Sequence, residues 1–165
     1  NRELLLLTIK NAFDYIANSK ESPVVPIHAA IGESEKHAKH VYEGGSEFPM
    51  ITFNQLIDKY DISKIDYLKV DCEGGEYSFL NAKNLEWISN NVGHMAMEIH
   101  LRATESGALD FLKFRDEFLK HFFDQGKVHF MHNVYSKTIW DDHAILSKDH
   151  SKVPAEFMIY IKNKR

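Results

Sequence analysis

The chain has little of several features that would each point to a class of protein. It contains one cysteine among its 165 residues, so no intramolecular disulfide can form, and a reducing, cytoplasmic compartment is favoured. Its 20 lysine and arginine residues are outnumbered by 24 acidic ones, so it lacks the positive excess that neutralises a phosphate backbone. We therefore expect no nucleic-acid partner, and a small or neutral molecule instead.

Long apolar runs and phosphate-binding glycine patterns are also missing. The longest early apolar run, residues 4–7, is far too short to cross a bilayer and lacks the flanks of a signal peptide, so we expect no membrane partner. The glycine pairs at 44–45 and 74–75 match neither a dinucleotide fingerprint nor a P-loop. Nucleoside triphosphate chemistry is therefore not supported.

The apolar content is enough for one core. Hydrophobic residues make up 44% of the chain, which suits a single domain over residues 1–165. Apolar residues from Arg2 to Asn18 follow helical spacing. Because the chain starts without methionine and enters this helix at once, we expect it to be the C-terminal part of something longer.

Strand and helix patterns then alternate along the chain. Thr52, followed by Gln55, is typical of a capping box that opens a helix. Helices are also predicted after the glycines at 74–75 and over 108–124, and a loop is predicted around Trp140. Strands are predicted at 24–31, 67–70, 94–100, 127–131 and 157–162. This order predicts an α/β three-layer sandwich with mostly parallel strands and an antiparallel C-terminal strand pair.

Polar side chains follow the predicted strands, where ligands bind in such sheets. Asp71 directly continues an apolar strand, where an unpaired carboxylate is costly, so a functional role is favoured. Glu73 and Glu76 are equally well explained as acids in the first turn of a helix. Cys72 lies between two acids that raise its pKa, so we interpret it as a packing residue.

Two later strands also end in ionisable residues. Glu98 must be paired, hydrogen-bonded or protonated, and an ion pair with Lys69 or Arg102 is the ordinary explanation. His100 and His132 have the chemistry of general bases or metal ligands, and interior hydrogen-bonded histidines explain them equally well. Together, the ionisable residues that follow the predicted strands hold enough donors for a divalent ion: Asp71, Glu73, Glu98, His100 and His132. Their spacing in the sequence matches no metal-binding motif, so we predict no metal site.

Residues 51–57 (ITFNQLI) and 65–76 (IDYLKVDCEGGE) resemble the T-L-D-x-L … I-D-x-L-K-I-D-V-E-G-x-E signature of FkbM-type methyltransferases. The resemblance extends over residues 23–161. It implies an S-adenosylmethionine-dependent methyltransferase with a Rossmann-like sheet, usually acting on hydroxyl groups of glycans or small natural products. The resemblance assigns Ala29, Ala30 and Asp71 to the methyl donor, and Asp71, Glu73, Glu98 and His132 to catalysis around the acceptor.

The chain departs from the family at its beginning. The family's first strand, its glycine-rich D-x-G-A-x-x-G loop and the acid ending its second strand are absent from these 165 residues. We therefore expect a sheet lacking its first two strands, with an exposed edge that a homo-oligomer would cover. Two alternatives stay open: a non-catalytic binding or assembly module on a degenerate fold, and a metal-dependent hydrolase using Asp71, Glu98 and His132.

Overall fold

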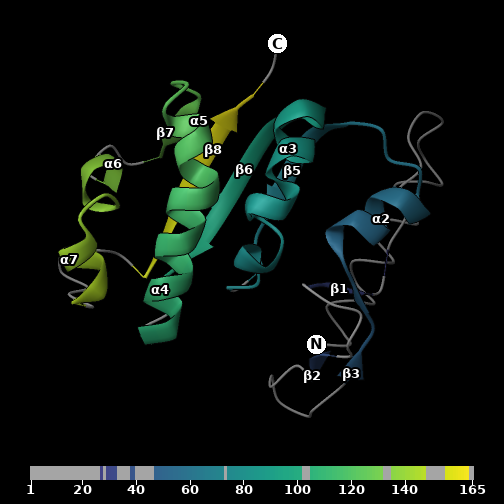
Figure 1. Ribbon diagram of the computed structural model, residues 1–165, viewed down its shortest axis with the longest axis horizontal. Helices are drawn as coiled ribbons and strands as arrows, with labels where there is room; N and C mark the ends of the chain where they lie inside the picture. The colour runs from purple at the N-terminus through teal and green to yellow at the C-terminus, as the bar shows by residue number, and fades with distance from the viewer. Residues whose placement is uncertain are drawn as a thin grey trace, which may run out of the picture. The chain divides into compact units, whose positions relative to one another are not determined.

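The structure is a computed structural model that describes residues 27, 29–32, 38–39, 47–72, 74–101, 105–131, 135–147 and 155–163 (Figure 1). The chain divides into two compact units, Asn1–Ala30 with His37–Pro49, and Ile31–Lys36 with Met50–Arg165. In the first unit, β2 (Ala38–Lys39) pairs antiparallel with β3 (Glu47–Phe48). The single domain over residues 1–165 stays a prediction.

The capping box predicted at Thr52 is confirmed. The Gln55 N–H donates to Thr52 Oγ1 at 3.2 Å, and the Thr52 N–H donates to Gln55 Oε1 at 2.9 Å. These bonds satisfy N–H groups that the first helical turn leaves without partners. They open α2 (Phe53–Lys59), which buries Phe53 and Ile57. Before α2, the two-residue strands β1 (Ala30–Ile31) and β4 (Met50–Ile51) form a sheet of their own.

The second unit is built on a four-stranded sheet in the order β5-β6-β8-β7. Its strands are β5 (Ile65–Val70), β6 (Val92–His100), β7 (Val128–Phe130) and β8 (Glu156–Lys162). β5 and β6 are parallel, whereas β8 lies antiparallel between β6 and β7 (Figure 1). The α/β class and the antiparallel pairing of the last two strands are therefore confirmed. The prediction of mostly parallel strands does not hold for this described sheet, in which one of three pairings is parallel.

The connection from β5 to β6 is helical, in two pieces. A short 3₁₀ helix, η1 (Glu76–Ser78), follows the glycine turn. Asn81 then caps α3 (Ala82–Asn91) by accepting a hydrogen bond from the Lys83 N–H at 3.1 Å. Strand, helix and parallel strand thus form the βαβ unit that the sequence predicts.

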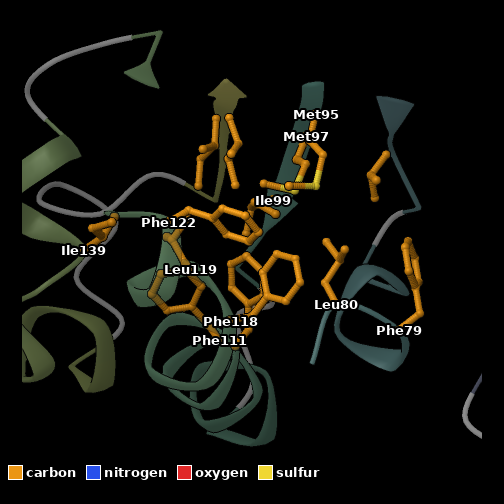
Figure 2. Close-up of a cluster of buried hydrophobic side chains, with 14 of the residues drawn as sticks. Phe79, Leu80, Met95, Met97, Ile99, Phe111, Phe118, Leu119, Phe122 and Ile139 are labelled. Carbon is orange, nitrogen blue, oxygen red and sulfur yellow. The ribbon is translucent and has the colours of Figure 1, made fainter. Parts of the chain in front are cut away.

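A long helical segment supplies most of the core beside the sheet. It consists of α4 (Glu105–Phe114), the π-helical turn η2 (Arg115–Leu119) and α5 (Lys120–Phe123). Figure 2 shows the rings of Phe111 and Phe118 below Met97 and Ile99 of β6, all of them fully buried. The helical spacing of the phenylalanines therefore reflects core packing.

The prediction of a loop around Trp140 is wrong in part, because Trp140 and Asp141 lie in a turn but helices flank this turn on both sides. Two short helices, α6 (Tyr135–Thr138) and α7 (Asp142–Leu146), occupy this part of the chain. The Asp141 side chain caps α7 by accepting from the Ala144 N–H at 3.1 Å. A helix of four or five residues is too short to show a periodic apolar pattern. The polar composition of this part of the chain therefore predicted a loop.

Buried Arg115 ties α7 to the long helical segment. Its Nη1 donates to Asp142 Oδ1 at 2.6 Å and to the Ile139 carbonyl at 3.1 Å, and its Nε donates to Asp116 Oδ1 at 2.7 Å. Burial alone lowers the pKa of the guanidinium, but the hydrogen bonds to the two carboxylates raise that pKa overall. Arg115 thus stays charged inside the core.

The sheet has one buried and one partly exposed face. On β6, Met95, Met97 and Ile99 are buried, whereas the alternate residues His94, Ala96 and Glu98 are only partly covered. Because side chains alternate along a strand, these two sets point to opposite faces. A covering layer on the second face, which the three-layer prediction requires, is not part of the described arrangement. Among the described residues, no helix is long and apolar enough to cross a bilayer.

Candidate functional site

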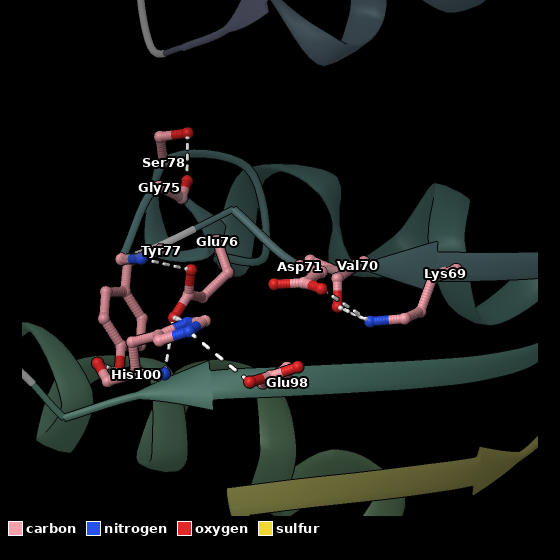
Figure 3. A network of polar contacts seen from close by, with 10 residues as sticks. Lys69, Val70, Asp71, Gly75, Glu76, Tyr77, Ser78, Glu98 and His100 are labelled. Atoms are coloured by element: carbon pink, nitrogen blue, oxygen red, sulfur yellow. Dashed lines mark hydrogen bonds and ion pairs between the residues drawn. The ribbon is translucent and has the colours of Figure 1, made fainter. Parts of the chain in front are cut away.

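Three ionisable side chains from two strand ends meet at one edge of the sheet. Since β5 and β6 are parallel, with Val70 opposite Met97, their carboxyl ends lie at the same edge. Asp71 follows β5, and Glu98 and His100 lie at the end of β6. Each of these three offers a donor atom within 4.8 Å of the other two (Figure 3). We call this group the Asp71–Glu98–His100 cluster.

Asp71 is reachable from solvent, contrary to the sequence argument that it is desolvated. Its side chain is 46% exposed, and Oδ2 lies 3.2 Å from Lys69 Nζ. The two side chains leave the strand two positions apart on the same face, which allows this exposed ion pair. An exposed pair contributes little to stability, so the Asp71 carboxylate can exchange this partner for a ligand at small cost.

Glu98 faces the histidine and is not paired with Lys69. Its Oε1 lies 3.8 Å from His100 Nε2, and its side chain keeps 27% exposure. The Lys69 ammonium instead contacts Asp71 and the Val70 carbonyl. Arg102, the other partner considered for Glu98, lies outside the described residues. The Glu98 carboxylate is thus near the imidazole and partly open to solvent.

Glu76 is the residue of this site whose burial the sequence pattern did not predict. It does stand in the first turn of η1, but its side chain is fully buried and not an exposed helix-start acid. Glu76 Oε1 accepts the backbone N–H of His100 at 2.7 Å and lies 3.3 Å from His100 Nδ1. Glu76 Oε2 accepts the N–H of Gly74 at 2.8 Å. The carboxylate therefore positions both the backbone and the ring of His100.

The turn after β5 explains how Glu76 reaches the neighbouring strand. Gly74 has φ 89°, a left-handed conformation that glycine adopts without penalty. The turn reverses the chain, so Glu76 and Tyr77 both reach the end of β6. The Tyr77 hydroxyl donates to the His100 carbonyl at 2.7 Å (Figure 3). In the sequence, the glycine pair at 74–75 directly before Glu76 is the signal that could have predicted this turn and the position of Glu76.

The signature on which the site is built also matches a known family. A family model described as the methyltransferase FkbM domain matches residues 9–130. The chain belongs to the FkbM methyltransferase domain family. The resemblance noted in the sequence is thereby confirmed, and the matched range includes the Asp71–Glu98–His100 cluster and Glu76. Comparisons with curated proteins and with solved structures found no significant match.

In this FkbM domain, Cys72 is not prepared for nucleophilic chemistry. Desolvation by neighbouring atoms is the main cause that raises the pKa of the thiol. The charges of Glu76 and Asp71 raise this pKa further, while a backbone hydrogen bond and Lys69 oppose the change. The predicted direction is correct, but acidic neighbours are the smaller cause. Cys72 is exposed, so the prediction that it is a packing residue is wrong.

The remaining residues assigned from the sequence are not brought into this cluster by the described structure. Glu73 and His132 lie outside the described residues. Ala29 and Ala30 are half-buried, and Ala30 donates its N–H to the Pro49 carbonyl at 2.9 Å within the first unit. The roles of Ala29, Ala30, Glu73 and His132 in the FkbM domain stay predictions.

Proposed function

We propose that this FkbM domain is an S-adenosylmethionine-dependent methyltransferase that methylates a hydroxyl group of a glycan or of a small natural product. The observation that carries the proposal is the meeting of Asp71, Glu98 and His100 at the carboxyl ends of two parallel strands, within a methyltransferase family. This edge of an α/β sheet is where ligands bind.

The donor set at this edge suits S-adenosylmethionine, whose reactive sulfur carries a positive charge. Asp71, Glu76 and Glu98 bring three carboxylates close together, and among the described residues the Lys69 ammonium contacts Asp71. Opposite charges attract strongly in a partly desolvated site. When bound, the cofactor supplies an electrophilic methyl group. We assign Asp71 to the methyl-donor side, with Ala29 and Ala30 near the adenine.

The acceptor hydroxyl needs a group that holds it in line and a group that takes its proton. Glu98 keeps part of its side chain exposed, so an acceptor entering from solvent can reach its carboxylate. Positioning of reacting groups and proton removal by a placed base each lower the barrier to transfer. We assign Glu98 to the acceptor, together with Glu73 and His132.

The proposal is tested by calorimetry with S-adenosylmethionine, on this chain and on a version extended upstream in its coding region. Methyl transfer from labelled cofactor is then measured across a set of glycans and hydroxylated small molecules. Cofactor binding by either protein, followed by label in a hydroxyl-bearing product, is the expected result. Binding by neither protein overturns the proposal.

Two other functions give different results in the same experiments. A non-catalytic assembly module predicts no cofactor binding and a stable homo-oligomer in sedimentation, the self-association that an uncovered sheet edge also favours. A metal-dependent hydrolase predicts turnover of ester or glycoside substrates with no methyl donor present. Neither result is compatible with cofactor-dependent methylation as the primary activity.

A further inference from the structure

We propose that Asp71, Glu98 and His100 bind one divalent metal ion. The three residues supply an imidazole nitrogen and two carboxylate oxygens, with donor atoms within 4.8 Å of one another. This metal site goes beyond the methyltransferase proposal, because its existence does not require a methyl donor or an acceptor. It also differs from the hydrolase alternative, which used His132 and not His100.

The spacing of the cluster fits a shared ion. Protein nitrogen and oxygen ligands lie about 2.0–2.2 Å from a zinc-sized ion, so two ligands of one ion lie at most about 4.4 Å apart. His100 Nε2 and Glu98 Oε1 are separated by 3.8 Å, too far for a hydrogen bond and within this range. The donor atoms of the whole cluster lie within 4.8 Å, slightly beyond this range, and the 46% exposed side chain of Asp71 can turn toward the ion.

A carboxylate lies against the second ring nitrogen of His100, as in most metal-binding histidines. Such a histidine usually donates its second ring N–H to a carboxylate, which fixes the ring and raises the basicity of the ligating nitrogen. Here Nδ1 lies 3.3 Å from the fully buried Glu76 carboxylate, and Nε2 is the ring nitrogen toward Glu98. Glu76 also accepts the His100 backbone N–H, so it fixes both the ring and the strand end.

The local charge favours a dication. Two carboxylates, Asp71 and Glu98, belong to the proposed site, and a third, Glu76, lies against the other ring nitrogen of His100. The Lys69 ammonium contacts Asp71. The Lys69 and Asp71 side chains are both about half exposed, so breaking their ion pair costs little stability. A bound ion can therefore replace the ammonium, and the flexible lysine side chain can extend into solvent.

The donor types select the kind of ion. One imidazole with two carboxylates suits Mn²⁺ or Zn²⁺, whereas soft ions prefer thiolates. Cys72 is not part of this group, whose donor atoms come from Asp71, Glu98 and His100. Three protein ligands leave at least one coordination position open, which an oxygen atom of a second molecule can occupy.

The site is tested with Mn²⁺ alone, on the full 165-residue chain after treatment with a chelator. Free Mn²⁺ is followed by electron paramagnetic resonance, because the protein's scattered histidines bind Mn²⁺ more weakly than Zn²⁺ or Cu²⁺. We expect one ion per chain. We also expect at least tenfold weaker binding for Asp71→Asn and for Glu98→Gln, and Zn²⁺ should displace the Mn²⁺.

Asp66→Asn is the matched control. Asp66 forms an exposed ion pair with Lys64 at 3.1 Å, two positions apart on the same strand, as Asp71 does with Lys69. It lies at the other end of β5 and outside the cluster. Asp66→Asn should leave the Mn²⁺ affinity unchanged. An equal loss of affinity in Asp66→Asn and Asp71→Asn would mean that only surface charge attracts the ion, and this result would overturn the site.

Glu76→Gln tests the support of His100. It should weaken Mn²⁺ binding by about 10–100-fold, the usual effect of removing such a supporting carboxylate. Circular dichroism checks that the variant is folded. If Glu76→Gln is unfolded, the test depends on Glu98→Gln, because Glu98 is partly exposed and its replacement disturbs the fold less. The site is also overturned if no stoichiometric binding occurs below millimolar Mn²⁺, or if Asp71→Asn and Glu98→Gln bind as the native chain does.

Binding of Mn²⁺ is measured without cofactor or acceptor, so the two proposals fail separately. Loss of methyl transfer with intact Mn²⁺ binding rejects only the proposed function. Absence of Mn²⁺ binding with intact methyl transfer rejects only the metal site.

Discussion

The Glu76 carboxylate accepts the backbone N–H of His100 at 2.7 Å and lies 3.3 Å from Nδ1 of the same residue. Glu76 is fully buried, and the two residues are 24 positions apart in the chain. A buried carboxylate needs hydrogen-bond partners to offset the loss of its hydration. The turn after β5 and the end of β6 are therefore locked together by one side chain.

Replacing Glu76 by alanine should destabilise the fold. The variant leaves the N–H groups of Gly74 and His100 without their acceptor, and each unsatisfied buried group costs about 1–3 kcal/mol. We expect the free energy of unfolding in urea to fall by about 2–6 kcal/mol. Glu86→Ala, at an exposed position on α3, should change it by less than about 0.5 kcal/mol. A comparable small loss for Glu76→Ala would contradict the buried network.

Asp71→Asn should separate function from stability. The Asp71–Lys69 pair is exposed, so its loss should cost about 0–1 kcal/mol and barely move the melting temperature. Methyl transfer by a cofactor-competent version should fall at least tenfold, while Asp66→Asn retains full activity. Equal loss of activity and melting temperature for Asp71→Asn would mean that Asp71 is structural.

Gly93→Ala should push β5 and β6 apart. A Cβ atom at this position would lie 2.8 Å from the carbonyl oxygen of Asp66, a backbone atom that cannot move without disturbing the strand pairing. Overpacking of this kind costs about 1–3 kcal/mol. Thermal unfolding should show a lower midpoint. An unchanged midpoint would mean that the two strands separate at this end without cost.

Arg115→Ala should loosen α7 and lower stability. The change removes the hydrogen bonds to Asp142 and to the Ile139 carbonyl, and it leaves space in the core beside Trp140. We expect a loss of about 2–4 kcal/mol, below the usual upper values because Asp142 is exposed and regains water. The matched variant Lys120→Ala breaks an exposed pair with Asp124 and should cost about 0.5 kcal/mol or less. Equal losses would rule out an anchoring role for Arg115.

Cys72 should react slowly with iodoacetamide near neutral pH. Because the folded state raises the pKa of the thiol, the reactive thiolate forms only at higher pH than in the unfolded chain. Folded stability should correspondingly fall as pH rises through the interval between the unfolded and the folded pKa. Alkylation rates measured against pH, in buffer and in urea, check this. If the alkylation rate rose at lower pH in buffer than in urea, the predicted direction of the pKa change would be contradicted.

The sequence predicted those parts that depend on nearby residues. Thr52 and Gln55 stand three positions apart, so their capping box needs no distant contact. The strands containing Val70 and Met97 are short and mainly apolar, and their parallel pairing brings Asp71, Glu98 and His100 to one edge. The signature over residues 65–76 identified the family because it lies in one unbroken segment.

Tertiary structure alone decided the state of each side chain in the site. The sequence pattern treated Asp71 as desolvated and Glu76 as an acid at a helix start, whereas Asp71 is exposed and Glu76 is buried. Burial depends on what packs against a residue from elsewhere in the chain, such as His100 against Glu76. Arg115 meets Asp142 over 27 positions in the same way. Local pattern thus determined elements and family, while long-range packing determined which carboxylate is reachable and which one holds the histidine.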